Sequence, residues 1–258
     1  MKRAHLGCLL LLAAGCVGRP QPSGSLSAGA TNVAPGEAAA VRLALYDSAR
    51  QRPVPVVVYA PEGSEANVRR KLAIISHGYG GHSTDYSFIA RHLVAQGYFV
   101  ASVQHELPTD ESLPTTGNPR EVRRPNWERG VQNILFVRLE LRQQYPTLDF
   151  DKLLLVGHSN GGDMALLCAL EHPELVQRVI SLDSRRMPFP RARWLRVLSL
   201  RSSDQVADAG VLPTAAEQRQ FGITIIRLPG TIHNYLWDGA TAAQKREMNE
   251  HVSRFLTE

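Results

Sequence analysis

The residues best suited to chemistry in this chain form the segment Gly157-His158-Ser159-Asn160-Gly161. Apolar residues 153–156 precede it and a helix-prone run follows it. A strand, a glycine-flanked turn and a helix together hold a serine at the tip of a strained turn, where it serves as a nucleophile. The glycines are needed because larger side chains would clash there. Ser159 is therefore the candidate nucleophile, although the pentapeptide alone also fits a glycine-rich loop with an incidental serine.

A serine nucleophile of this kind needs a histidine and a carboxylate, each at a strand end. His233 follows the last apolar run, just after a Pro-Gly turn, and we predict that it accepts the Ser159 proton as a general base. We predict that Asp204, in the turn after the preceding strand, orients His233. Asp208 in the same loop is the first alternative, and Asp183 at the end of an earlier strand is the second.

A second glycine-rich segment, His77-Gly78-Tyr79-Gly80-Gly81, directly follows the third predicted strand. Backbone N–H groups in such a loop stabilise the negatively charged oxygen of an acyl-transfer intermediate. We assign one donor to Tyr79, with Gly80 as the alternative, and the other to Asn160 at the start of the helix. No Gly-Lys-Ser/Thr follows, which argues against a phosphate-binding loop. The histidines lack carboxylate or cysteine partners at ligand spacing, so we expect no metal and no cofactor.

The substrate site is expected to be lined by Tyr79, His158, Trp127 and Phe189. Residues 106–125 form a long loop after the fourth predicted strand, and loops of this length are usually functional or disordered. We expect this loop to form a wall of the pocket.

Short apolar runs alternate with helical periodicity through most of the chain. This pattern predicts a mostly parallel, eight-stranded α/β sheet with helices on both faces and an antiparallel hairpin at its N-terminal edge. The hairpin is expected at 41–46 and 54–59, the other strands at 72–76, 99–103, 153–156, 179–182, 195–200 and 223–228, and the helices at 84–96, 126–145, 215–220 and 242–256.

The first residues read as a signal peptide. Lys2 and Arg3 precede a short apolar run, and small residues precede Cys16. The pattern resembles a bacterial lipoprotein signal, so residues 1–15 would be removed and Cys16 lipidated. Residues 16–38, rich in Pro, Gly, Ser and Ala, are then a flexible tether, and residues 39–258 are the catalytic domain. The expected location is the periplasm or the outer membrane, with secretion as the alternative.

The distribution of charged residues indicates which kinds of binding partner to expect. The net charge of +5 over 258 residues is spread along the chain, without the aromatic-interleaved basic face of a nucleic-acid binder. We therefore expect no nucleic acid, and contact with a membrane only through Cys16. Of the three cysteines, Cys168 alone would remain unmodified, and we expect it to be a buried thiol in the helix after Ser159.

The order Ser159, Asp204, His233 and the two glycine-rich segments resemble the α/β-hydrolase superfamily, and its dienelactone-hydrolase-like and lipase-like esterase branches in particular. The resemblance spans about residues 40–257 and implies a serine hydrolase acting on a small-molecule ester. Residues 184–193 are too few for the large helical cap of many relatives. Amide cleavage, acyl transfer and perhydrolysis use the same residues, and a non-catalytic envelope-binding lipoprotein is the alternative from another class.

Overall fold

The structure, a computed structural model, describes residues 39–61 and 69–258. The predicted signal peptide 1–15, Cys16 and the tether 16–38 lie outside the described residues. Within the described ranges, no helix has the length and apolar character needed to cross a membrane.

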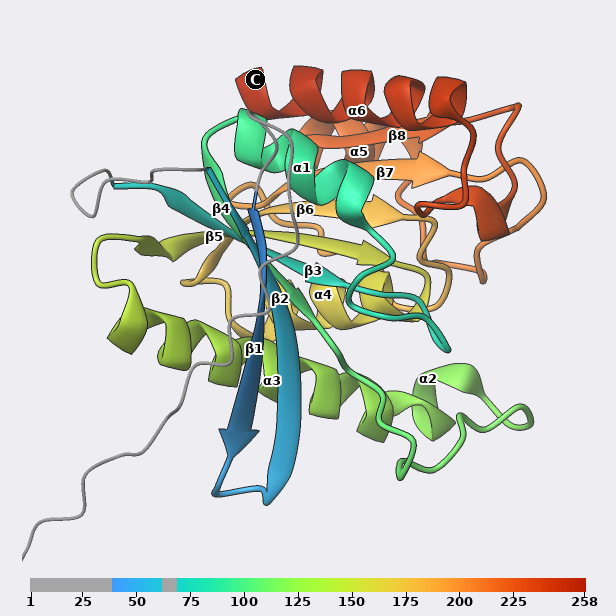
Figure 1. Ribbon diagram of the computed structural model, residues 1–258. Coiled ribbons are helices and arrows are strands. Elements are labelled where there is room, and N and C mark those ends of the chain that lie inside the picture. The colour runs from blue at the N-terminus through green and yellow to red at the C-terminus, as the bar shows by residue number, and fades with distance from the viewer. Residues whose placement is uncertain (1–38, 62–68) are drawn as a thin grey trace, which may run out of the picture.

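Strands and helices alternate along the chain after an opening hairpin (Figure 1). The strands are β1 Ala39–Asp47, β2 Arg52–Ala60, β3 Lys71–Ser76, β4 Tyr98–Val103, β5 Asp149–His158, β6 Val176–Leu182, β7 Arg196–Arg201 and β8 Ile223–Arg227. The helices are α1 Ser87–Ala95, α2 Pro119–Val122, α3 Arg124–Gln144, α4 Asn160–Glu171, α5 Ala215–Phe221 and α6 Ala242–Thr257, with a short 3-10 helix, η1, at His233–Tyr235.

The eight strands form one sheet in the order β1-β2-β4-β3-β5-β6-β7-β8. β1 pairs with β2 and β2 with β4 in antiparallel fashion, and every other pair in the sheet is parallel. The predicted α/β architecture, including the antiparallel hairpin at the N-terminal edge, is therefore confirmed. The helices start and end within a few residues of their predicted bounds, and α2 interrupts the loop predicted at 106–125.

Both faces of the sheet are covered, which explains why most of its strands contain runs of consecutive buried apolar residues. Successive side chains of β5 point to opposite faces. Leu153 and Leu155 belong to the core under α3 and α4, whereas Leu154 and Val156 belong to the core under α1 and α6. Figure 1 shows α1 and α6 on one side of the sheet and α3 and α4 on the other.

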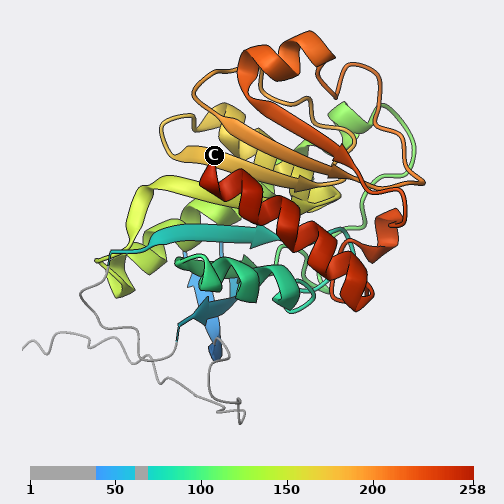
Figure 2. The same cartoon turned by 90° about the horizontal axis from the view of Figure 1, so that it is seen from above.

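The chemistry-bearing segments converge at one edge of this sheet. Because β3 to β8 run in the same direction, their carboxyl ends lie together, close to η1 (Figure 2). Ligands of open α/β sheets bind at this edge. Ser159, Asp183 and His233 follow the ends of β5, β6 and β8 respectively.

Candidate active site

Ser159 stands in a backbone conformation that is rare for a residue with a side chain. It lies between β5 and α4 with φ 51° and ψ −117°. Strain of this kind costs on the order of 1–3 kcal/mol and persists only where the surroundings enforce it. The surroundings are tight, since a Cβ on Gly161 would lie 2.3 Å from the carbonyl oxygen of Ser76. The turn thus holds the Ser159 hydroxyl outward at the edge of the sheet.

The hydroxyl meets a histidine from the far end of the chain. His233 Nε2 lies 3.0 Å from Ser159 Oγ, within hydrogen-bond distance. His233 is the first residue of η1 and is 9% exposed. Its position after β8 agrees with the sequence analysis, and the short distance allows direct proton transfer between the two side chains.

The other ring nitrogen of His233 faces Asp183. Asp183 Oδ2 lies 2.7 Å from His233 Nδ1, and the carboxylate also accepts a hydrogen bond of 2.6 Å from the Ser202 hydroxyl. Arg201 forms a 2.7 Å ion pair with Oδ1. Burial raises the pKa of Asp183, but His233, Arg201 and Ser202 together lower it more, so that the net shift is downward. Asp183 is therefore an anion held by three partners.

The prediction that Asp204 orients the imidazole is wrong. Asp204 Oδ1 accepts a 2.7 Å hydrogen bond from the backbone N–H of His233, so it fixes the main chain rather than the ring. Asp208, the first alternative, lies 3.6 Å from Arg186 in an ion pair. The order of the strands explains the difference. Asp183 follows β6, which is the immediate neighbour of β5. Asp204 and Asp208 follow β7, which lies one strand further from Ser159. The position of Asp183 directly after its strand was the available signal.

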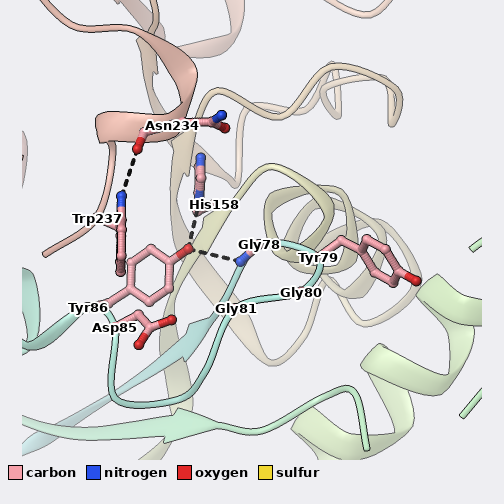
Figure 3. A pocket seen from close by; sticks show the side chains of 9 residues that line it. All are labelled: Gly78, Tyr79, Gly80, Gly81, Asp85, Tyr86, His158, Asn234 and Trp237. Atoms are coloured by element: carbon pink, nitrogen blue, oxygen red, sulfur yellow. Dashed lines mark hydrogen bonds between the residues drawn. The ribbon is translucent and has the colours of Figure 1, made fainter. Parts of the chain in front are cut away.

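A chain of hydrogen bonds that the sequence analysis missed joins the two loops beside Ser159. The N–H of Gly78 donates to the Tyr86 hydroxyl over 3.0 Å, and this hydroxyl lies 2.7 Å from His158 Nδ1 (Figure 3). His158 Nε2 lies 3.1 Å from the carbonyl oxygen of His233. Burial and the neighbouring His233 lower the pKa of His158 to about 3, so its ring is neutral. A neutral ring that accepts from Tyr86 and donates to His233 satisfies every contact in this chain.

The two predicted oxyanion donors come from the turn after β3 and from the start of α4. Asn160 is the first residue of α4, so its N–H has no carbonyl one turn earlier to bond. Tyr79 lies in the turn after β3, with a side chain 47% exposed. Its phenol oxygen accepts a 3.1 Å hydrogen bond from the Leu113 N–H, and its ring points away from the neighbouring pocket (Figure 3). Tyr79 therefore contributes backbone rather than ring to that pocket.

The pocket beside these residues has a volume of about 350 Å³. Two of the predicted lining residues, Tyr79 and His158, are part of it. The prediction is wrong for the other two: Trp127 is 0% exposed and Phe189 is 1% exposed, because both pack in the core under α3 and α4. The pocket lies instead between the loop after β3 and the loop that carries η1. Its lining residues are Gly78, Tyr79, Gly80, Gly81, Asp85, Tyr86, His158, Asn234 and Trp237.

Trp127 and Cys168 are buried and lie outside the pocket lining. Trp127 Nε1 donates a 2.8 Å hydrogen bond to Asn160 Oδ1 and so supports the residue after Ser159. Cys168 is buried in α4, and burial raises the pKa of its thiol to about 12, which keeps the thiol protonated. In the part of the chain that the structure describes, no group of three or more His, Cys, Asp or Glu residues could hold a metal ion.

A glycine-flanked serine in a strained turn, at the carboxyl edge of a mostly parallel eight-stranded sheet with an antiparallel hairpin, defines an α/β-hydrolase. A family model described as serine aminopeptidase, S33, matches residues 67–204, more than half of the chain. The protein belongs to this family of hydrolases.

Curated relatives are more distant. Platelet-activating factor acetylhydrolases from Canis lupus familiaris and Bos taurus are each 25% identical over an alignment of 167 residues, and the match covers 49% of this chain and 37% of the relative. The similarity thus spans little more than a third of these relatives' own length.

Solved structures share the fold at low sequence identity. An esterase from Rhizomucor miehei has a TM-score of 0.64 at 14% identity, over 86% of this chain and 82% of the other. A dienelactone hydrolase-like phosphotriesterase from metagenomic libraries also has a TM-score of 0.64, at 16% identity over 86% and 99%. A ferulic acid esterase from Streptomyces cinnamoneus has a TM-score of 0.62 at 17% identity over 89% and 91%. These likenesses establish the fold.

Replacing Asp183 by Asn is expected to lower the free energy of unfolding by about 3–5 kcal/mol near neutral pH, because Arg201 keeps a buried charge without its partner. The pKa of Asp183 lies below its ordinary 3.8 in the folded protein. Its stabilising contribution is therefore fully present above that pH and is lost as the pH falls through the folded-state value. Urea unfolding of both proteins across this range measures the difference. A difference that stays constant down to strong acid contradicts an ionised Asp183.

Proposed function

We propose that this protein is a serine hydrolase that cleaves carboxylic esters through an acyl-enzyme intermediate. The observation that carries the proposal is the unbroken set of contacts from Ser159 Oγ to His233 Nε2, 3.0 Å, and from His233 Nδ1 to Asp183 Oδ2, 2.7 Å. A hydroxyl, an imidazole and a carboxylate in this order form the catalytic triad of acyl transfer.

Each step follows from these contacts. Ser159 Oγ bonds to the ester carbonyl carbon while its proton passes to His233 Nε2, and the carbonyl π electrons move to the oxygen. When the tetrahedral intermediate collapses, the bond to the alcohol oxygen breaks and that oxygen takes the proton from His233. Water then attacks the acyl-enzyme with His233 again acting as the base, which releases the acid and restores Ser159. Asp183 stays ionised and stabilises the imidazolium form of His233.

The backbone N–H groups of Tyr79 and Asn160 are the proposed oxyanion donors. A donor in such a hole acts on charge that exists only in the transition state, and the loss of one typically costs about 3 kcal/mol of transition-state stabilisation. The pocket of about 350 Å³ begins at the backbone of Tyr79, which suits it to hold one of the two substituents of the ester. Two kinds of relative support an ester as the substrate: the platelet-activating factor acetylhydrolases and the esterases of similar fold.

Amide cleavage next to a free amino group is a second candidate, favoured by one observation. Asp85 is the one charged residue in the pocket lining, and a carboxylate there suits a substrate ammonium group. The matching family model is named for an aminopeptidase. We expect kcat/KM to be higher for p-nitrophenyl acetate than for an aminoacyl p-nitroanilide. A higher value for the anilide, lost in Asp85→Asn, selects the aminopeptidase instead.

Replacing Ser159 by Ala is expected to lower kcat on p-nitrophenyl acetate by on the order of a millionfold, since the nucleophile is lost. Labelling by a fluorophosphonate probe should disappear at the same time. Ser48→Ala is the matched control, because Ser48 is exposed in the turn between β1 and β2 and should react like the parent. An unlabelled but folded parent protein sinks the proposal and favours a non-catalytic envelope protein.

Substitutions of the two aspartates near His233, Asp183 and Asp204, are expected to have different effects on kcat. Asp183→Asn should lower kcat by about 10⁴-fold, because His233 loses the carboxylate that holds its ring in the reactive orientation. Asp204→Asn should retain most of the activity, since the hydrogen bond between Asp204 and His233 involves the main chain of His233 and not its ring. Rates are compared per folded protein, counted by circular dichroism. The opposite ranking of the two variants would restore Asp204 as the acid.

A further inference from the structure

A largely buried carboxyl group that the proposed mechanism does not use lies against the side chain of Asn160, one of the two proposed oxyanion donors. Glu106 follows the end of β4, and its side chain is 14% exposed. Glu106 Oε1 accepts a long hydrogen bond of 3.4 Å from Asn160 Nδ2. Its other oxygen, Oε2, lies 3.3 Å from His77 Nδ1. One carboxyl group thus touches side chains from the ends of two different strands.

These two side chains belong to the two halves of the proposed oxyanion hole. Asn160 supplies one donor from its own backbone, and His77 lies two residues before Tyr79, which supplies the other. The His77 ring is tied to that second half, because His77 Nδ1 lies 2.8 Å from the carbonyl oxygen of Gly78. Glu106 therefore lies between the two halves of the proposed oxyanion hole, hydrogen-bonded to Asn160 and in contact with the His77 ring.

The Asn160 side chain has no freedom to turn away from Glu106. Its Oδ1 accepts from Trp127 Nε1 over 2.8 Å, and its Nδ2 donates over 2.8 Å to Asn126 Oδ1. Asn160 is 3% exposed. A change of charge on Glu106 therefore acts on Asn160 directly, because the Asn160 side chain is held in place and does not rotate away.

We propose that Glu106 is a positioning residue of the oxyanion hole, which supports the Asn160 side chain and packs against His77, and which, when protonated, lets negative charge develop on the substrate oxygen without an opposing anion nearby. This inference rests on the proposed function, because the oxyanion exists only in acyl transfer. When Glu106 is ionised, its charge repels the forming oxyanion and acylation slows.

The charged groups around Glu106 do not neutralise it. Arg129 from α3 faces it but forms an ion pair of 3.4 Å with Asp110, an anion that also faces Glu106. Arg52 from β2 is bound to the same Asp110 over 2.6 Å. The His77 ring is uncharged, because its burial lowers its pKa to about 4. Its Nε2 accepts from the backbone N–H of His105, so the proton of the neutral ring resides on Nδ1.

Glu106 therefore changes charge near neutrality. Burial raises its pKa to about 7, an effect that Asp110 reinforces and that Arg129, Asn126 and Asn160 only partly offset. Within the described residues, Glu106 Oε2 is buried without a hydrogen-bond partner, which makes it the oxygen that gains the proton. Since the neutral form dominates below this pH, the rate should fall as the pH rises through it.

The test measures kcat and KM against pH for the parent, Glu106→Gln and the control Glu128→Gln, with a neutral ester. Glu128 is an exposed residue of α3 that bonds Arg124. In the parent and the control, kcat should fall by about tenfold from its maximum to a lower plateau above pH 7, the scale on which one charge acts across several ångströms of protein. Glu106→Gln, which mimics the neutral acid, should keep the higher kcat, with KM unchanged.

A second variant keeps the inference testable if Glu106→Gln does not fold. Arg129 lowers the pKa of Glu106, so Arg129→Gln should move the fall in kcat to higher pH. The inference is overturned if Glu106→Gln follows the parental profile, or if it loses activity equally at every pH. Ser159→Ala distinguishes the failure of this inference from the failure of the proposed function. If Ser159→Ala abolishes activity but the parent and Glu106→Gln have the same pH profile, only the role of Glu106 is wrong.

Discussion

The site depends on one buried charge, the carboxylate of Asp183. It is 0% exposed, and an isolated anion at such a position would be strongly disfavoured. Arg201 and the Ser202 hydroxyl, from the end of the neighbouring strand β7, and the His233 ring, from η1, compensate it. These same contacts hold His233 with its second nitrogen toward Ser159. The interaction that makes the anion tolerable is thus the one that orients the base.

The sheet determines which residues can take part. β5 and β6 are adjacent, so Ser159 and Asp183 leave the edge side by side, and β8 lies two strands beyond β6. His233 must reach back across β7, and the loop after β8 does so with its backbone anchored by Asp204 and by His158. Asp204 is therefore a support of the base loop, a role that chain order alone does not distinguish from that of the triad acid.

The sequence predicts most of the fold and the two side chains that meet at its edge, Ser159 and His233, because strands and turns are encoded locally. Apolar runs define the strands, and the glycines around Ser159 define its turn. The carboxylate that contacts the His233 ring is less clearly encoded, since Asp183, Asp204 and Asp208 all follow strands. Asp183 differs in following its strand directly and in leaving the strand next to β5. The pocket is misassigned for a similar reason: Trp127 lies in α3 on the face toward α4, and local periodicity does not tell a pocket wall from a core residue.

The pKa values of two carboxyl groups at the same edge, Asp183 and Glu106, shift in opposite directions, and the surroundings of the two groups explain the difference. Asp183 has a dedicated arginine and a hydroxyl donor, which hold its pKa below the ordinary value despite burial. Glu106 shares its nearest cation with Asp110 and receives only a long amide contact, so burial prevails and its pKa rises to about 7. A permanent anion suits the group that stabilises an imidazolium. A group beside a forming oxyanion serves better without charge, which is why the pairing of arginines with Asp110 rather than with Glu106 matters to the chemistry.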